Sequence, residues 1–258
     1  MIHKNELAIL EFDDVYDSVI MPTHEKLDLT LPRKCVYGFL GDHIDQYAIK
    51  NKAKKIVEFD SATKTYPIYI INHKDYDLTL VQAPVGSAPA AQLMDWLIGY
   101  GVKEIISTGT CGGLVAMPES TFIVPTRALR QEGTSFHYVR PSRYIDLNSV
   151  AISAIEDLFK KRGLKYSEVM TWTTDGFYRE TKNLVKYRVE EGCSVVEMEC
   201  SALAAVAEMR KVVFGEILFT ADTLADIENY DQRNWAKDSL AYALELAMDA
   251  VILIKNNK

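Results

Sequence analysis

The sequence predicts a single-domain α/β protein, organised as a three-layer α/β/α sandwich around a central mixed sheet. Short runs of β-branched and aromatic residues alternate along the chain with longer segments of helical period, which is typical of a sheet with largely parallel strands. No internal repeat or low-complexity linker marks a boundary between domains. A chain of 258 residues, 48% of them hydrophobic and 25% charged, can bury a sizeable core without metals or disulfides.

The predicted strands are short apolar runs rich in β-branched and aromatic residues. They cover residues 35–40, 68–72, 78–83, 104–108, 121–124, 168–173 and 213–220. Segments of helical period lie between several of these runs, as expected for one α/β sheet with helices packed against it.

Four helices are predicted to pack on this sheet. Residues 92–100, 198–209 and 240–254 carry apolar side chains at helical spacing, which we interpret as core contacts rather than cofactor contacts. The fourth helix begins after Asn148, a favourable N-cap, and ends near Gly163, which can adopt the left-handed cap conformation.

We expect residues 1–34 to form an N-terminal arm or extension, and residues 35–258 to form the α/β domain. Pro22 and Pro32 bracket a polar segment within the first part of the chain. Such a segment can be a surface loop or, in an oligomer, can lie on a neighbouring subunit.

Charge and cysteine content exclude several classes of function. The net charge of −7 argues against nucleic acid as the main partner, because its binding usually needs a basic surface. Neither histidines nor cysteines have metal-ligand spacing, so we predict reduced thiols, no metal and no cofactor. The N-terminus is unlike a signal peptide, and Glu245 and Asp249 interrupt the longest apolar stretch. We therefore expect a cytoplasmic protein with no membrane partner.

The first of three candidate site motifs is Ser-Thr-Gly-Thr-Cys-Gly-Gly-Leu at residues 107–114, directly after a predicted strand. Its glycines can turn the backbone sharply and point N–H groups at one spot, and Thr110 adds a hydroxyl donor. This pattern favours an anion site, although it is equally common in a tight turn without a ligand. The spacing does not match a Walker or dinucleotide-binding motif.

The other two motifs place carboxylates where ligands commonly bind. Val-Glu-Met-Glu at residues 196–199 precedes a helix of small residues. These carboxylates can accept hydrogen bonds from both ribose hydroxyls, or they can simply stabilise the N-terminus of the helix. Asp222 follows a buried strand, at the sheet edge where open α/β sheets bind ligands, although helix capping is an alternative.

Together these motifs resemble the trimeric and hexameric nucleoside phosphorylase family, which includes purine nucleoside phosphorylases, uridine phosphorylases and methylthioadenosine nucleosidases. The likeness runs from about Val36 to the C-terminal helix and keeps the family's motif order. It implies a phosphorylase/hydrolase-like fold, a homo-oligomer (dimer, trimer or hexamer) and cleavage of the bond between ribose and base. It also implies that Gly41, Gly109 and Thr110 lie on the phosphate side of the site, and that Phe177 stacks on the base.

The resemblance implies roles for the remaining site residues. Glu197, Met198 and Glu199 look like the family's ribose-binding signature. Asp222 sits where purine-specific members carry the aspartate that protonates purine N7, a role that needs a pKa raised by burial. Arg233, at the start of the last predicted helix, matches an arginine that partners this aspartate, although an exposed helix-start arginine would explain it equally well.

The sequence departs from the family at the phosphate site. Gly41 is followed by Asp-His-Ile-Asp where the family has Asp-Pro-x-Arg, so Asp45 replaces an arginine. Ser107 replaces a second arginine before the glycine-rich segment. Phosphate binding depends on charge-assisted hydrogen bonds, so the site needs other cations. Arg127 and Arg130, just after the next predicted strand, are candidates, unless they are ordinary loop residues.

We therefore predict a nucleoside phosphorylase, a pentosyltransferase that uses inorganic phosphate to convert a purine ribonucleoside into free base and ribose 1-phosphate. The predicted partners are a small-molecule nucleoside and phosphate. Three alternatives stay open. Water can replace phosphate, since Ser-Thr-Gly at 107–109 is nearer to the nucleosidases. The base can be uracil, since residues 128–137 resemble uridine phosphorylases. The chain can also bind nucleosides without catalysis.

Overall fold

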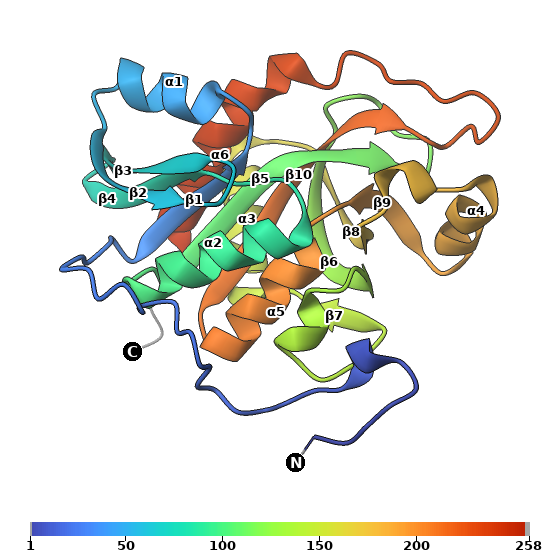
Figure 1. Cartoon of the computed structure of the whole chain (residues 1–258). Coiled ribbons are helices and arrows are strands. Elements are labelled where there is room, and N and C mark those ends of the chain that lie inside the picture. Colours follow the sequence, from blue (N-terminus) through green and yellow to red (C-terminus); the bar gives the residue numbers. More distant parts are fainter. Residues whose placement is uncertain (1, 256–258) are drawn as a thin grey trace.

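The computed structural model describes residues 2–255 and confirms an α/β fold with helices around a central mixed sheet (Figure 1). The ten strands of the sheet are β1 (Lys34–Phe39), β2 (Lys54–Asp60), β3 (Thr65–His73), β4 (Tyr76–Gln82), β5 (Glu104–Gly113), β6 (Phe122–Gln131), β7 (Tyr144–Asp146), β8 (Tyr166–Thr174), β9 (Cys193–Glu197) and β10 (Val213–Thr223). The helices are α1 (His43–Lys50), α2 (Ser87–Gly99), α3 (Ser149–Arg162), α4 (Lys182–Glu190), α5 (Cys200–Arg210) and α6 (Leu240–Leu253).

The sheet has two parts that differ in strand pairing. β1, β4, β3 and β2 form an open extension, parallel between β1 and β4 and antiparallel beyond. The other part closes on itself, because β10 pairs with both β5 and β6, and β9 pairs with both β8 and β5. Together with the parallel pair β6–β8, these strands form a ring of five. The sequence did not predict this ring, which places several strand ends around one point.

Helices cover both faces of the sheet. α2 and α5 lie side by side on one face, and α3 and α6 pack together on the other (Figure 1). Leu97 and Val206 belong to the core beneath α2 and α5, and Phe159 and Leu244 belong to the core beneath α3 and α6. Burial of each such side chain contributes about 1.5–3 kcal/mol, so the sheet is held firmly from both sides.

Every predicted strand and helix has a counterpart in the structure, and the caps of α3 are confirmed. The Asn148 side chain accepts a hydrogen bond from the Val150 amide (3.0 Å), and Gly163 has a left-handed φ of 65°. Five elements have weaker sequence signals and were not predicted. β2 is a charged edge strand, β7 and β9 are three and five residues long, and α1 and α4 are largely polar.

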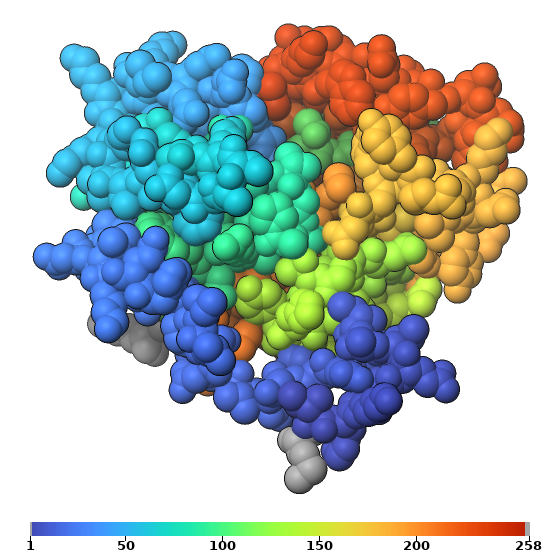
Figure 2. Space-filling view, in the orientation of Figure 1, coloured from blue at the N-terminus to red at the C-terminus, as the bar shows by residue number. Residues whose placement is uncertain are grey.

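The N-terminal segment crosses the outside of the molecule, and between residue 2 and β1 it contains no strand or α-helix. Within those residues its only regular element is a 3-10 turn at Ala8–Leu10. Figures 1 and 2 show this blue segment running along one edge of the molecule, past the ends of α5 and α2. Arg140 donates to Asp14 (2.8 Å) and the Trp96 indole donates to Glu25 (2.8 Å), so the segment contacts the domain of its own chain.

Three further features concern membrane-spanning helices, possible metal ligands and the cysteines. No helix within residues 2–255 is long and apolar enough to span a membrane. The same residues contain no group of three or more histidine, cysteine, aspartate or glutamate side chains that could hold a metal ion. The four cysteine thiols are free and buried.

Candidate active site

Two adjoining cavities lie at the carboxyl ends of β5 and β10, the sheet edge where α/β proteins commonly bind ligands. The inner cavity, of about 170 Å³, is lined by residues 109–112, residues 196–199, Phe39, Val85, Glu216 and Leu218. The outer cavity, of about 640 Å³, is lined by Tyr178, Lys182, Val185, Leu224, Asp226, Ile227 and Tyr230. Both cavities share Phe177, Glu180, Asp222 and Trp235, which therefore mark their junction.

The glycine-rich segment does not make the sharp turn that we expected, because β5 continues through it to Gly113. Its glycines are required by close packing instead. A Cβ on Gly109 would lie 2.9 Å from the Phe39 Cβ, and a Cβ on Gly112 would lie 3.0 Å from a methyl of Val196. The strand consequently brings Gly109 and Thr110 to the wall of the inner cavity with little side-chain bulk.

Glu197 ends β9 and is the most extensively bonded acid of the inner cavity. One carboxylate oxygen accepts from the hydroxyls of Thr173 (2.6 Å) and Thr171 (3.2 Å). The other accepts from the backbone amides of Glu199 (2.7 Å) and Cys200 (2.6 Å), at the start of α5. Burial raises the pKa of Glu197, whereas these four hydrogen bonds favour its ionised form. This carboxylate fixes the N-terminus of α5 and with it the position of Glu199.

Glu199 occupies the N-cap position of α5 and lines the inner cavity. The backbone amide of Gly86 donates to its Oε1 (2.5 Å), and the Ser87 hydroxyl donates to the carbonyl of Met198 (2.6 Å). Burial, followed by the charge of Glu197, raises the pKa of Glu199 to about 8. The start of α2 thus holds the Glu-Met-Glu segment from the opposite wall of the cavity.

Asp222 lies at the junction of the two cavities, where its side chain is buried. The Tyr230 hydroxyl donates to its Oδ2 (3.0 Å), and burial raises the pKa of the Asp222 carboxyl against this hydrogen bond. A raised pKa suits a carboxyl that must carry a proton into a reaction at neutral pH. Sequence reasoning missed Tyr230, which lies eight residues beyond Asp222 in a segment without periodicity.

Arg233 does not lie at the start of a helix, because α6 begins only at Leu240. It stands in the preceding loop with a left-handed φ of 49°. Its guanidinium donates to the carbonyls of Met117 (2.6 Å) and Ala221 (3.5 Å). The charge of Arg233 lowers the pKa of Asp222, which opposes the larger effect of burial. The structure therefore brings Arg233 next to the strand that carries Asp222. Its hydrogen bonds go to backbone carbonyls, one of them on Ala221 beside Asp222.

Phe177 and Glu180 reach both cavities from the segment between β8 and α4. The Phe177 ring is 43% exposed and packs edge-on against Tyr178, with 5.0 Å between ring centroids. Glu180 was not predicted as a site residue. Burial, followed by the charge of Asp222, raises the pKa of Glu180 to about 7. Two acids therefore face the junction, and both are easier to protonate than a free carboxyl.

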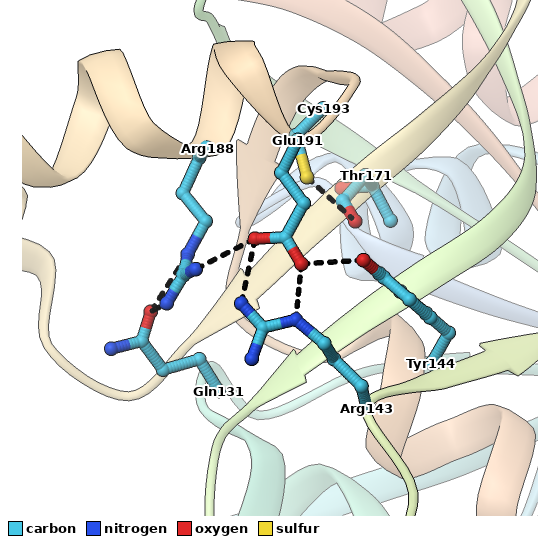
Figure 3. A network of polar contacts seen from close by, with 7 residues as sticks. All are labelled: Gln131, Arg143, Tyr144, Thr171, Arg188, Glu191 and Cys193. Carbon is cyan, nitrogen blue, oxygen red and sulfur yellow. Dashed lines mark hydrogen bonds and ion pairs between the residues drawn. The ribbon is translucent and has the colours of Figure 1, made fainter.

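A network of polar contacts anchors the far end of α4 to the sheet (Figure 3). Glu191 accepts hydrogen bonds from Arg143, from the Tyr144 hydroxyl (2.5 Å) and from Arg188 (2.9 Å). Arg188 also donates to the side chain of Gln131 in β6 (2.7 Å). Arg143 contributes most to lowering the pKa of Glu191 to about 2. This network ties α4, and hence the segment that carries Phe177, to β6 and the turn before β7.

Glu216 is a fully buried acid in the middle of β10 that sequence reasoning missed. The Ser107 hydroxyl donates to its Oε1 (2.9 Å), and its Oε2 has no hydrogen-bond partner among the described residues. Burial, followed by the charge of Glu197, raises the pKa of Glu216 to about 8. An acid within the apolar run Val-Phe-Gly-Glu-Ile-Leu-Phe was the one sequence signal that could have revealed it.

The family model described as the phosphorylase superfamily matches residues 34–249, most of the chain. The chain belongs to the phosphorylase superfamily. It is an enzyme of the nucleoside phosphorylase and nucleosidase type, as the resemblance of its motifs implied.

Several relatives within the superfamily are similar to this chain. The DeoD-type purine nucleoside phosphorylase of Buchnera aphidicola (strain 5A) is 23% identical over 246 residues, covering 93% of this chain and 96% of that protein. The 5′-methylthioadenosine/S-adenosylhomocysteine nucleosidase of Buchnera aphidicola (strain APS) is 27% identical over 167 residues, covering 60% and 72%. The uncharacterized protein R802 of Acanthamoeba polyphaga mimivirus is 26% identical over 154 residues, and the matched part is 58% of its length.

Solved structures from the superfamily share the fold. The AMP nucleosidase of Bacteroides thetaiotaomicron VPI-5482 superposes with a TM-score of 0.70 at 23% identity, covering 88% of this chain and 91% of that chain. A uridine phosphorylase of Vibrio fischeri ES114 has a TM-score of 0.75 at 18% identity, covering 86% and 92%. At these identities the structural likeness establishes the fold but not the substrate, which depends on the residues of the site.

The two positions where the resemblance places phosphate arginines are occupied differently in this superfamily member. The Ser107 hydroxyl donates a hydrogen bond to Glu216, and Asp45 accepts a hydrogen bond from the Tyr69 hydroxyl (3.1 Å). Gly41, which we expected on the phosphate side, is exposed and does not line the inner cavity.

Arg130 does not replace the missing arginines, which corrects our expectation. Its buried guanidinium donates to the hydroxyls of Ser135 (2.8 Å) and Ser142 (2.7 Å) and to the carbonyl of Arg140 (2.9 Å), away from the inner cavity. Arg127 is paired with Asp146 (2.6 Å). Within the described part of the chain, the lining of the inner cavity therefore contains no lysine, arginine or histidine.

Proposed function

We propose that this enzyme is a nucleosidase, which cleaves the N-glycosidic bond of a purine ribonucleoside with water. The composition of the inner cavity carries this proposal. Glu197, Glu199 and Glu216 line it, and none of its described lining residues is basic. A phosphate anion placed beside these acidic side chains would lose its hydration and find no cation to pair with, whereas water carries no such cost.

The proposed reaction needs an acid on the side of the base and a hydrogen-bond acceptor on the side of the sugar. Cleavage develops positive charge on the ribose and sends the electron pair of the C1′–N bond to the base. Asp222 protonates N7 of the departing purine, and Phe177 stacks on its ring. Glu199 accepts hydrogen bonds from the ribose hydroxyls, and Met198 packs beneath the sugar. Water adds to C1′ and loses a proton to a carboxylate of the inner cavity.

Phosphorolysis is the second candidate, with free base and ribose 1-phosphate as products. It is favoured by the similarity to the DeoD-type purine nucleoside phosphorylase, which extends over 93% of this chain. Thr110 and the backbone around Gly109 would then face the phosphate, as the motif resemblance implies. The missing positive charge would have to come from outside the inner cavity, for example from a neighbouring subunit of a homo-oligomer. We expect a cytoplasmic homo-oligomer without cofactor in either case.

Base release in the presence and absence of phosphate separates the two candidates. The purified chain is incubated with inosine, adenosine, guanosine and uridine, and the sugar product is identified as free ribose or ribose 1-phosphate. The nucleosidase proposal predicts release of purine and free ribose at the same rate without phosphate. A strict requirement for phosphate with ribose 1-phosphate as product would overturn it in favour of phosphorolysis. Asp222→Asn serves as the inactive control for both.

A further inference from the structure

The outer cavity is much larger than the base of an unmodified nucleoside requires. Its volume is about 640 Å³, against about 170 Å³ for the inner cavity that would receive the sugar. Sites of about 300–1,000 Å³ hold an entire drug-sized ligand. A purine at the junction, beside Phe177 and Asp222, would consequently leave most of the outer cavity unfilled.

The wall of the outer cavity is suited to an apolar or aromatic group. Val185 reaches it from α4, and Leu224, Ile227 and Tyr230 reach it from the loop between β10 and α6. The charged residues of the wall already have partners or lie at the junction. Lys182 is paired with Glu228, and the carboxylate of Asp226 accepts from the backbone amide of Glu228 (3.0 Å) and the Asn229 side chain (2.9 Å).

The position of Asp222 determines which edge of a purine faces the outer cavity. An acid that protonates N7 lies beside the edge of the purine that carries both N7 and the substituent on C6. Because Asp222 and Glu180 line both cavities, a group attached at C6 would pass between these acids into the outer cavity. A secondary amine at C6 keeps one N–H, which can donate to either carboxylate.

We infer that the outer cavity is a subsite for an apolar substituent on the 6-amino group of a purine, so that the substrates are adenine nucleosides with an alkyl or aryl group on N6. This inference rests on the proposed cleavage of purine nucleosides and specifies their class. Burial of several carbon atoms of such a group favours it over an unsubstituted amine, because transfer of each apolar carbon from water into an apolar cavity is favourable.

The first test compares N6-benzyladenosine with adenosine as substrates, together with binding of the free bases N6-benzyladenine and adenine. We expect kcat/KM to be about tenfold or more higher for N6-benzyladenosine, and N6-benzyladenine to bind more tightly than adenine by a similar factor. Cleavage of adenosine together with rejection of N6-benzyladenosine would overturn the subsite and leave the proposed function intact. Tight binding of N6-benzyladenine without cleavage of any nucleoside would support the subsite and refute the proposed function.

A variant that fills the outer cavity sharpens the test. Ile227 lies in a loop, so Ile227→Trp adds bulk without disturbing a strand or helix. We expect it to lower kcat/KM for N6-benzyladenosine by about tenfold and to change that for adenosine less than about threefold. Ile49→Trp, at an exposed position of α1 outside both cavities, is the matched control and should alter neither. Equal losses on both substrates in Ile227→Trp would contradict the assignment.

Discussion

The two cavities of the site are built in different ways. The inner cavity is lined by strand ends and by the start of α5. Its acids are buried and accept hydrogen bonds from the protein, as the four donors to Glu197 illustrate. The outer cavity is lined mostly by connecting segments, where Tyr178 is 93% and Tyr230 is 55% exposed. Rigid strand ends can hold reacting groups to a fraction of an ångström, whereas loops can change sequence without disturbing the core. We therefore expect the inner cavity to determine the reaction and the outer cavity to determine the substrate.

The largest effect is expected at the junction, where Asp222 serves the reaction. Asp222→Asn keeps the size of the side chain and removes the proton that the departing base needs. We expect kcat to fall by about 10²–10⁴-fold, measured as base release at saturating substrate. The matched control is Asp226→Asn, which alters an exposed acid of the outer cavity and should change kcat less than about threefold. Unchanged turnover in Asp222→Asn would exclude this residue as the acid.

A second expected effect concerns the free energy of unfolding. It should differ between Glu216, a buried acid of the inner cavity, and Glu104, a buried acid that is paired with a lysine. The pKa of Glu216 is raised from 4.5 to about 8, first by burial and then by the charge of Glu197. Between these values the folded state keeps a proton that the unfolded chain has lost. The free energy of unfolding therefore falls as the pH rises from about 4.5 to about 8, and is insensitive to this group outside that window.

Glu216→Gln should remove that pH dependence. We expect the variant to match the native protein at about pH 4, below this window, and to exceed it in free energy of unfolding at pH 8 by on the order of a few kcal/mol. Denaturant unfolding at a series of pH values measures this. Glu104→Gln removes a buried acid paired with Lys34 (2.5 Å) and, as a control, should destabilise the protein at pH 8. Parallel stability curves for native protein and Glu216→Gln would contradict the prediction.

The difference between the cavities also explains how much could be predicted from the sequence. β5 and β10 are apolar runs that end in short motifs, and Glu-Met-Glu stands out by its two carboxylates, so the sequence predicts Glu197, Glu199 and Asp222 as site residues. The outer cavity depends on Tyr230 and Glu180, which lie in segments without periodicity, and their roles come from tertiary proximity alone. The ring of strands was equally invisible, because the antiparallel contacts β10–β6 and β5–β9 each involve only two residue pairs.

Glu199→Gln tests whether the inner cavity acts through the sugar. Above its raised pKa of about 8 Glu199 is ionised, so the assay is run at a pH above 8. The substitution then weakens hydrogen bonds from the ribose hydroxyls, and a hydrogen bond to a charged group is worth about 1.5–3 kcal/mol. We expect kcat/KM for a ribonucleoside to fall by about 10–100-fold. A 2′,3′-dideoxynucleoside lacks both hydroxyls and serves as the control, since it should lose much less on the same substitution. An equal loss on both substrates would indicate that Glu199 supports the fold of the cavity rather than the ribose.

The smallest effect is expected from Phe177, which contacts the base and takes no part in proton transfer. Stacking of a base on an aromatic ring is worth about 1–3 kcal/mol, and the 43% exposure of this ring favours the lower end. Phe177→Ala should therefore raise KM by about fivefold and leave kcat nearly unchanged, because stacking is similar in the ground state and the transition state. Phe177→Tyr keeps the ring face and is the matched control. If kcat fell as steeply in Phe177→Ala as in Asp222→Asn, the ring would be needed to align the base for protonation. A residue that contacts the base would then also determine the reaction, and the separate roles of the two cavities would be refuted.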